Sequence, residues 1–285
     1  MTKFPKDPFF DAIEKNNIDI VQSYIALKHD INAMDQYGNY PLHVAFKHGK
    51  NIIINLLIEA GADIQAKDKF GNTCLHFASY QDDTNLVNLC IQHKIPIDTT
   101  DDEGKTALIT ASEYGNSVEY GNSVINLLIK NGANVNHQDN NGDTALFFAI
   151  DNSHNAIAHK LLKFGANPNI ENIFKITPLH TSCKRGHLST TELLLPHIIN
   201  INHQDSYGLT ALHYAATHDR LDLIETLINN GANILIKDNQ NKSALDYAIE
   251  KNYTSVVDYL SIQYNYCELN QNLSNSIQSH TKFKI

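Results

Sequence analysis

The fold of this chain is decided by the stretch Asp205-Ser206-Tyr207-Gly208-Leu209-Thr210-Ala211-Leu212-His213-Tyr214-Ala215. Asp-x-x-Gly favours a tight turn, because the Asp side chain bonds nearby backbone N–H groups and Gly accepts a positive φ. Thr210 is a typical N-cap residue, and Leu212 and Ala215 fall on one face of a helix that starts after it. The stretch therefore predicts a turn followed at once by a short helix with a small apolar face.

The same pattern recurs along most of the 285 residues. Five of the six spacings between successive starts equal 33 residues, and a fixed period of this length is typical of stacked repeats. Length alone would have suggested about two globular domains. A second apolar run follows the first helix, and in four units it ends in Gly-Ala-Asp or Gly-Ala-Asn, where Gly suits the position after a helix. The starts are Asp35, Asp68, Asp101, Asp139, Asn172, Asp205 and Asp238.

Thr-Pro-Leu-His at Thr177, Gly-Ala-Asp at Gly61 and the 33-residue period together resemble the ankyrin repeat family. The resemblance covers roughly residues 4–264. It implies an all-α fold, an ankyrin-repeat solenoid of about eight stacked helix-turn-helix units with β-hairpin loops. We expect one ankyrin repeat domain over 1–264 and a loosely held polar tail over 265–285. Within the domain we predict a cap at 4–34, repeats from 35, 68, 101, 139, 172 and 205, and a C-terminal cap at 238–264.

Composition excludes several classes of protein. The net charge is −9, with 22 Lys+Arg against 31 Asp+Glu, which argues against nucleic-acid binding. No apolar run reaches the roughly 18–20 residues of a spanning helix, and the N-terminus has no apolar signal segment. Four cysteines without a Cys-x-x-Cys pair predict neither disulfides nor a zinc site and fit a reducing compartment. We therefore expect a soluble, intracellular (cytoplasmic) monomer without membrane insertion.

The residues with catalytic potential have structural explanations. The resemblance implies that His43, His76, His180 and His213, in the Thr-Pro-Leu-His position, bond backbone and Thr groups between repeats. Cys74, Cys90 and Cys183 occupy helix-packing positions and read as small buried apolar residues. Phosphate-binding loops, nucleophile elbows and kinase signatures are absent from the sequence. We expect no catalysis, no cofactor and no metal ligands; an enzyme is the least favoured alternative.

The variable positions carry the functional signal. The resemblance implies that a partner protein binds the concave face through the hairpin tips and first helices. Aromatic residues stand before the turn glycine at four of seven tips, and aromatics commonly anchor interfaces. The alternative is that they pack on adjacent hairpins. The candidate partner-binding residues are Tyr37, Phe70, Tyr80, Glu103, Tyr114, Ile173, Phe174, Ile176, Arg185, Tyr207, Leu209 and His218.

The tip aromatics form an N-terminal cluster around Tyr37 and Phe70 and a C-terminal cluster around Phe174 and Tyr207. An acidic stretch of the sequence separates the two clusters. A partner with a basic segment flanked by apolar residues would be complementary to this pattern. The acidic and polar residues concerned are Asp102, Glu103, Glu113, Asn141, Asp143 and Asp151.

Two repeats depart from the pattern. Residues 113–118 are repeated at once as 119–124, which is either a neutral duplication in a turn or a finger presenting Tyr114 and Tyr120. In the repeat from Asn172, Lys175 and Ile198 replace glycines. Pro196 should end the second helix about a turn early, which predicts an irregular hairpin at 195–202.

Two further hypotheses concern context. Frequent Asn and Ile and the polar C-terminal tail resemble ankyrin effectors that intracellular pathogens deliver into host cells, in which case the tail would be an unfolded secretion signal and the host protein the target. Separately, hairpin asparagines such as Asn136, Asn169 and Asn202 resemble sites of host asparaginyl hydroxylation.

Overall fold

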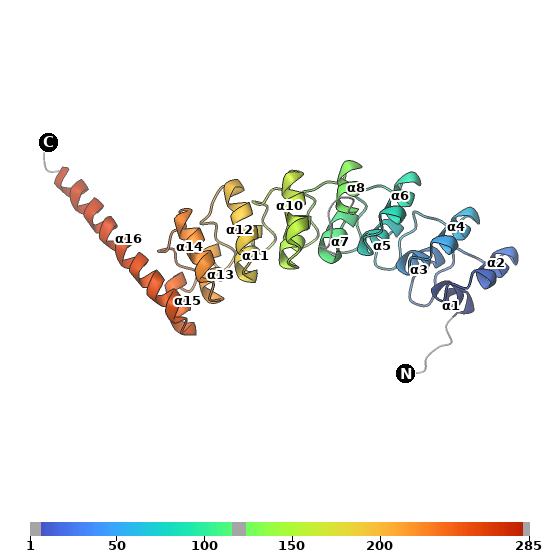
Figure 1. Ribbon diagram of the computed structural model, residues 1–285, viewed down its shortest axis with the longest axis horizontal. Coiled ribbons are helices and arrows are strands. Elements are labelled where there is room, and N and C mark those ends of the chain that lie inside the picture. Colours follow the sequence, from blue (N-terminus) through green and yellow to red (C-terminus); the bar gives the residue numbers. More distant parts are fainter. Residues whose placement is uncertain (1–6, 116–123, 282–285) are drawn as a thin grey trace. The chain divides into compact units, whose positions relative to one another are not determined.

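The computed structural model describes the backbone of residues 7–115 and 124–281, with side chains through 266 and that of Leu269. Over these residues the chain forms sixteen α-helices and one 3₁₀-helix, with isolated β-bridges but no extended strand (Figure 1). The chain divides into two compact units, Met1–Ala166 (unit 1) and Asn167–Ile285 (unit 2). Both are built from short antiparallel helix pairs, in agreement with the all-α prediction.

In unit 1 the two helices of each pair pack against each other, and successive first helices of the pairs also contact one another from α1 to α9. The helices therefore pack through their sides, and the turns that join them lie at the surface. The pairs are α1 (Pro8–Glu14) with α2 (Ile18–Ala26), α3 (Pro41–Lys47) with α4 (Asn51–Glu59), α5 (Cys74–Tyr80) with α6 (Thr84–Gln92), α7 (Ala107–Tyr114) with α8 (Val124–Lys130) and α9 (Ala145–Asp151) with α10 (Asn155–Lys163).

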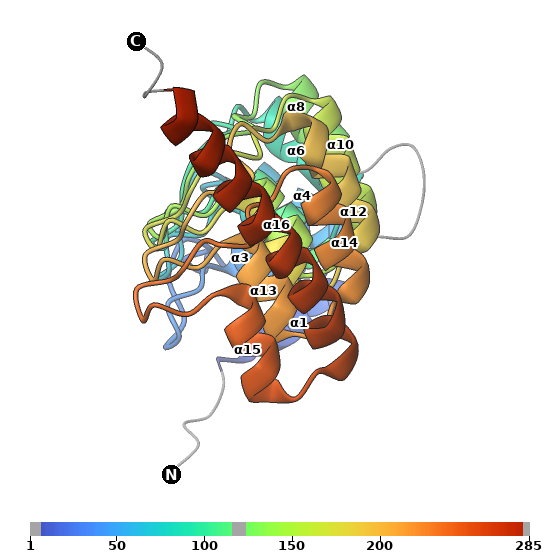
Figure 2. The same ribbon diagram turned by 90° about the vertical axis from the view of Figure 1, so that its left-hand side faces the viewer.

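Unit 2 repeats this arrangement, and its last helix is much longer than the others. In Figure 2, α16 continues well past the end of α15, on which its first turns pack. The pairs are α11 (Pro178–Arg185) with α12 (Leu188–Leu194) and the 3₁₀-helix η1 (Leu195–His197), α13 (Ala211–Thr217) with α14 (Leu221–Asn229), and α15 (Ala244–Lys251) with α16 (Thr254–Thr281).

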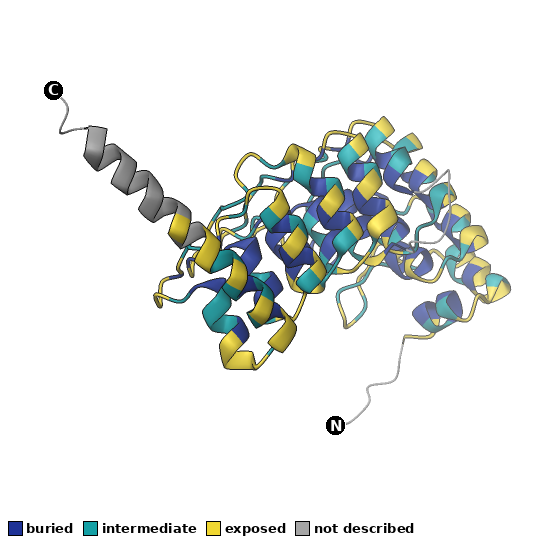
Figure 3. Ribbon diagram, turned by 60° about the vertical axis from the view of Figure 1, so that its left-hand side comes forward, coloured by how far each residue is buried: buried dark blue, intermediate teal, exposed yellow. Residues whose placement is uncertain are grey.

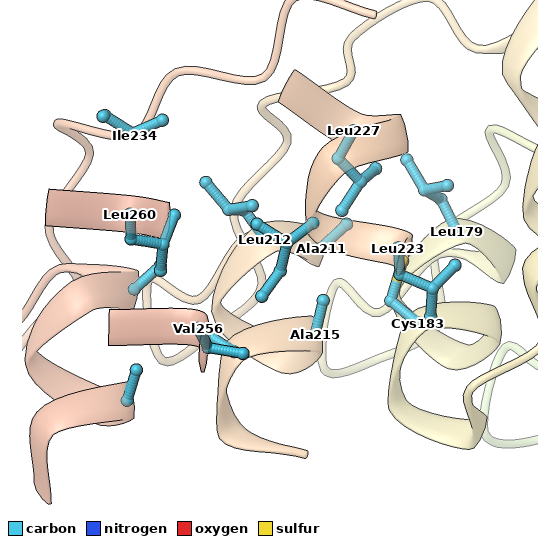
Figure 4. Packing of buried hydrophobic residues seen from close by; sticks show 14 residues of the cluster. Leu179, Cys183, Ala211, Leu212, Ala215, Leu223, Leu227, Ile234, Val256 and Leu260 are labelled. Carbon is cyan, nitrogen blue, oxygen red and sulfur yellow. The ribbon is translucent and has the colours of Figure 1, made fainter. Parts of the chain in front are cut away.

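The core consists of Leu, Ile and Val side chains from second helices that meet small residues from first helices. Figure 4 shows this in unit 2, where Leu223 and Leu227 of α14 face Ala211 and Ala215 of α13. All four side chains are buried. Figure 3 shows buried residues on the helix faces that meet, with exposed residues turned outward. The small alanines allow close helix approach, as the sequence pattern predicts.

Helix starts and turns follow the residues that predict them. Thr106 and Thr144 are N-caps whose hydroxyls accept hydrogen bonds from the backbone N–H three residues later. Gly208 has φ of +79°, and Lys175, which replaces the equivalent glycine, takes φ of +57° in the same conformation. Each turn closes with a backbone bond such as Asp205 N to Leu209 O, and three turns add only an isolated bridge.

The irregular repeat behaves as its sequence predicts. The helix α12 ends at Leu194, directly before the 3₁₀ turn that contains Pro196, and Ile198 has an extended φ of −81°. The duplicated segment separates α7 from α8, and Tyr120 lies outside the described residues.

The sequence predicts a loosely held polar tail after residue 264, and in the structure the backbone stays helical to Thr281. Asn, Gln and Ser weaken a helix individually, but residues 254–281 contain no proline or glycine to end one. The proposed boundaries of the ankyrin domain and of its repeats stay predictions.

Candidate functional site

A cleft of about 640 Å³ opens on unit 1 between consecutive repeats. Its walls come from the turn at Phe70, the first helices α5 and α7, and the turn that follows Asp101. The cleft unites four candidate residues, Phe70, Tyr80, Glu103 and Tyr114, whereas Tyr37 does not line it.

Aromatic rings form one side of the cleft. Tyr80 and Tyr114 end α5 and α7, and their ring centroids lie 5.0 Å apart. Both rings are about half exposed, as is Phe70, over which Lys69 Nζ lies 4.8 Å from the ring centroid. The tip aromatic therefore packs on its own turn yet keeps an open face. This contact lies within the turn of Phe70 itself, so the partner-binding role of Phe70 stays a prediction.

The floor of the cleft is an ion-pair cluster that sequence reasoning missed. Lys105 Nζ lies 2.7 Å from Glu113 Oε2 and 3.2 Å from Glu103 Oε2, and 4.8 Å from the Phe148 ring centroid. Burial opposes the charge on Lys105, but hydrogen bonds and the charges of Glu113 and Glu103 outweigh it and raise the Lys105 pKa. Lys105 and Glu113 are mostly buried, whereas the Glu103 side chain is 73% exposed.

A signal for this cluster was present in the sequence. A Lys four residues after the turn start, with a Glu eight residues later, recurs in the last repeat as Lys242 and Glu250. That pair also forms an ion pair, at 2.7 Å. The recurring spacing places both side chains on the same side of the first helix of a repeat.

The acidic stretch is smaller than the sequence predicts. Asp101 accepts hydrogen bonds from the backbone N–H groups of Glu103 and Lys105 and so holds its own turn. Asp143 is buried, which corrects the expectation that it lines a binding face. Asp143 directly follows its turn glycine, where the chain enters the next helix. Of the acidic residues that line the cleft, Asp102 and Glu103 are exposed, whereas Asp101 and Glu113 are half-buried.

The hairpin tips are linked to one another through backbone atoms. The carbonyls of Phe70 and Glu103 accept from the N–H groups of Asp102 and Asn140 at 2.9 Å. In unit 2 the carbonyls of Phe174 and Tyr207 accept in the same way from the following turns, at 2.9 and 3.0 Å. The side chains of these four tip residues are free to face solvent, and all four are exposed.

In unit 2 the candidate residues are distributed over two turns and two helix ends. Ile173, Phe174 and Tyr207 are exposed, and Ile176 and Leu209 are half-buried at the bases of the same turns. Arg185 and His218 are exposed at the ends of the neighbouring helices α11 and α13. The structure brings the tips at Phe174 and Tyr207 into backbone contact with the turns that follow them.

Three of the four repeated histidines make the predicted bonds on both ring nitrogens, whereas His43 bonds the Ala66 carbonyl through Nε2 and its buried Nδ1 has no partner among the described residues. His76 Nδ1 accepts from the backbone N–H of Thr73, and Nε2 donates to the Lys105 carbonyl of the next repeat at 3.1 Å. His180 and His213 bond the carbonyls of His203 and Lys242 in the same way. Because one nitrogen must accept and the other donate, each ring is neutral. Burial lowers their pKa values, that of His180 to about 4.

The family model described as Ankyrin repeats (3 copies) matches residues 9–89, 49–120, 82–172 and 156–238. These matches cover well over half of the chain. The chain belongs to the ankyrin repeat family. None of the curated proteins compared with this chain matches it significantly. Ankyrin repeats generally serve as protein–protein interaction modules and are typically not catalytic.

The asparagines singled out in the sequence connect successive ankyrin repeats. Asn169 Nδ2 donates to the His197 carbonyl at 2.8 Å, and its Oδ1 accepts from Ile199 N at 2.9 Å. Asn136 Nδ2 donates to Gly165 O, and Asn202 Oδ1 accepts from Asn233 N. Each side chain thus bridges turns. Hydroxylation of these residues stays a prediction.

The cysteines of the ankyrin fold are packing residues where they are described. Cys74, Cys90 and Cys183 are fully buried, and burial raises all three pKa values, that of Cys183 to about 12.

In a Cys267→Ser variant we expect a thiol reagent near neutral pH to label the native chain very slowly and the urea-unfolded chain at once. Rapid labelling of the native variant would revive the thiol-enzyme alternative.

Metal binding and membrane crossing find no support among the described residues. None of their His, Cys, Asp and Glu side chains form a group of three or more that could hold a metal ion. Within the same part of the chain, every helix is too short or too polar to cross a bilayer.

Proposed function

We propose that this ankyrin protein is a non-catalytic interaction module that binds an extended segment of a partner protein at the cleft of unit 1. The observation that carries the proposal is that aromatic rings and carboxylates from successive repeats line one cavity. The cleft opens at the hairpin tips and first helices, which is where the residues that vary between repeats occur in the sequence. The partner-binding roles of the individual residues are part of this proposal.

The chemistry of the cleft favours a basic residue flanked by apolar ones. Phe70, Tyr80 and Tyr114 offer large apolar faces at low cost in side-chain entropy. Lys105 pairs with Glu113 and also contacts Glu103, and the side chains of Glu103 and Asp102 are exposed at the rim. A partner Lys or Arg can therefore pair with the rim carboxylates and stack its stem on the rings.

Unit 2 offers a second contact surface in this proposal. The exposed tip side chains Ile173, Phe174 and Tyr207 would contact apolar residues of the same or another partner segment. The basic neighbour Arg185 would add specificity and not much affinity, since exposed ion pairs contribute little.

We expect replacement of both cleft anchors, Phe70→Ala with Tyr114→Ala, to weaken partner binding by at least about thirtyfold, because a true anchor contributes about 2 kcal/mol or more. Affinity purification with mass spectrometry identifies a partner, and titration of its purified binding segment gives the affinity. Phe174→Ala with Tyr207→Ala tests the second surface in the same titration.

The matched control is Leu27→Ala, which removes an exposed apolar side chain after α2, outside the cleft. Leu27→Ala should bind like the wild type. Equal affinity of the wild type and the Phe70/Tyr114 variant, with the fold intact by circular dichroism, would contradict the proposal.

The effector hypothesis now has less support than the sequence offered. It relied on an unfolded C-terminal signal, whereas residues 254–281 form a helix. Deleting residues 265–285 in a translocation reporter would still test delivery into host cells.

A further inference from the structure

The helix α16 has two apolar faces. One of them is buried in unit 2, where Val256 and Leu260 are almost completely covered and Tyr264 packs at the edge of the same core. This face attaches the first turns of α16 to α15. Beyond Tyr264, the described side chains of α16 are those of Asn265, Tyr266 and Leu269, and all three are exposed.

The opposite face carries large apolar residues that are exposed. Ile262, Tyr266 and Leu269 are 67%, 64% and 62% exposed. Their spacing of four and three residues, at about 100° per residue, places them within about 60° of one another and Leu260 on the other side of the helix. In the sequence the same spacing continues with Leu273 and Ile277.

A terminal helix of a repeat stack should present a polar outer face to water. The outer face of α16 is polar at Ser255 and Asp258 in its first turns, but beyond them it carries Ile262, Tyr266 and Leu269 exposed at coiled-coil-like spacing. Capping the repeats therefore does not account for these residues. Single exposed apolar residues need no explanation, but an ordered stripe indicates a surface that another molecule covers.

The residues beside the stripe indicate which kind of molecule covers it. Gln263 and Asn265 flank it in the structure, and the flanking sequence continues with Asn270 and Asn272. Amides both donate and accept hydrogen bonds, so a row of them complements a copy of itself. The acidic residues of the 254–281 segment are Asp258 and Glu268, and it contains no Lys or Arg. A strongly charged partner would find little to pair with.

We propose that the stripe Ile262, Tyr266 and Leu269 is a self-association surface, covered by the same stripe of a second copy of this chain. A two-fold pair of helices buries both apolar faces against each other and meets amide with amide. This departs from the monomer expected from the sequence, where the segment was taken as unfolded. The surface is short, so we expect a weak, concentration-dependent dimer.

The test is sedimentation velocity on the full-length chain from low micromolar to submillimolar concentration. The wild type should rise from 32.0 kDa toward twice that mass, and Ile262→Asp with Leu269→Asp should stay at 32.0 kDa throughout. Ser255→Asp is the matched control, since it adds a charge at an exposed position in the first turn of α16 and should dimerise like the wild type.

Circular dichroism shows whether each variant keeps its helices. A wild-type chain that stays at 32.0 kDa at every concentration would overturn the proposal, and so would dimers that persist in the Ile262/Leu269 variant. A monomer that instead pellets with phosphatidylcholine vesicles, and loses this in Ile262→Asp, would identify a lipid surface as the occupant and reject the second copy.

Discussion

Mild acid is expected to destabilise this protein before most of its carboxylates titrate. The buried rings of His43, His76, His180 and His213 are neutral in the folded state, and burial lowers the pKa of each. In the unfolded chain these residues have pKa values near 6.5. Below that pH these histidines bind protons in the unfolded chain but stay neutral in the folded one. The free energy of unfolding therefore falls as the pH decreases.

The size of the effect follows from His180. A pKa of 6.5 in the unfolded chain and about 4 in the fold corresponds to about 3 kcal/mol, fully present above pH 6.5 and lost on the way down to about pH 4. The other three rings act in the same direction. Asp246, whose pKa the bonds from Ser243 lower, adds a loss only below its ordinary range.

Urea unfolding at pH 7 and at about pH 4.5 measures this difference in unfolding free energy. His180→Ile, which copies Ile109 from the equivalent position of another repeat, should reduce the difference by about 2 kcal/mol. Leu212→Ala is the control, because it loses a buried side chain without removing a titrating group and should keep the full pH dependence. An unfolding free energy that does not change between the two pH values would refute this account.

Gly208→Ala is expected to cost about 2–5 kcal/mol of unfolding free energy, from two separate terms. The first is a left-handed backbone at φ of +79°, which a side chain disfavours. The second is crowding, because a β-carbon at Gly208 would lie 2.7 Å from the backbone nitrogen of Asn239 in the next turn. That nitrogen donates to the Tyr207 carbonyl, so the clash also disturbs the contact between repeats.

Gly231→Ala separates the two terms. Gly231 has φ of +92°, but a β-carbon there meets nothing within 4 Å. This variant should lose only the strain term, about 1–2 kcal/mol. Thermal and urea unfolding of both variants provide the comparison. Equal losses in the two proteins would show that crowding between turns contributes nothing.

The fold was predictable because each repeat places chemically distinctive residues at fixed positions. The N-cap role of Thr210, the turn glycine Gly208 and the early end of α12 at Pro196 all follow from local chemistry. The helical state of residues 265–281 did not follow, since Asn, Gln and Ser favour caps and loops and only the absence of breakers indicated otherwise.

The candidate site was predictable only in part. Tyr80 and Tyr114 are the last residues of neighbouring first helices and their rings meet, but Tyr114 lies one residue beyond the position that the 33-residue period makes equivalent to Tyr80, so the repeat did not pair them. The role of Lys105 was harder to find, because a lysine after a turn usually faces water and here its ammonium lies over the Phe148 ring. The burial of Asp143 depends on packing that a single sequence does not display.

The links between hairpin tips have a consequence for how such a protein diversifies. The carbonyls of Phe70, Glu103, Phe174 and Tyr207 make the contact to the following turn, and their own N–H groups bond the Asp or Asn that starts the turn. Neither bond involves the side chain. Any residue except proline can therefore occupy these positions at little cost in stability. Substitutions at these positions can change what the protein binds, one turn at a time, while the fold stays the same.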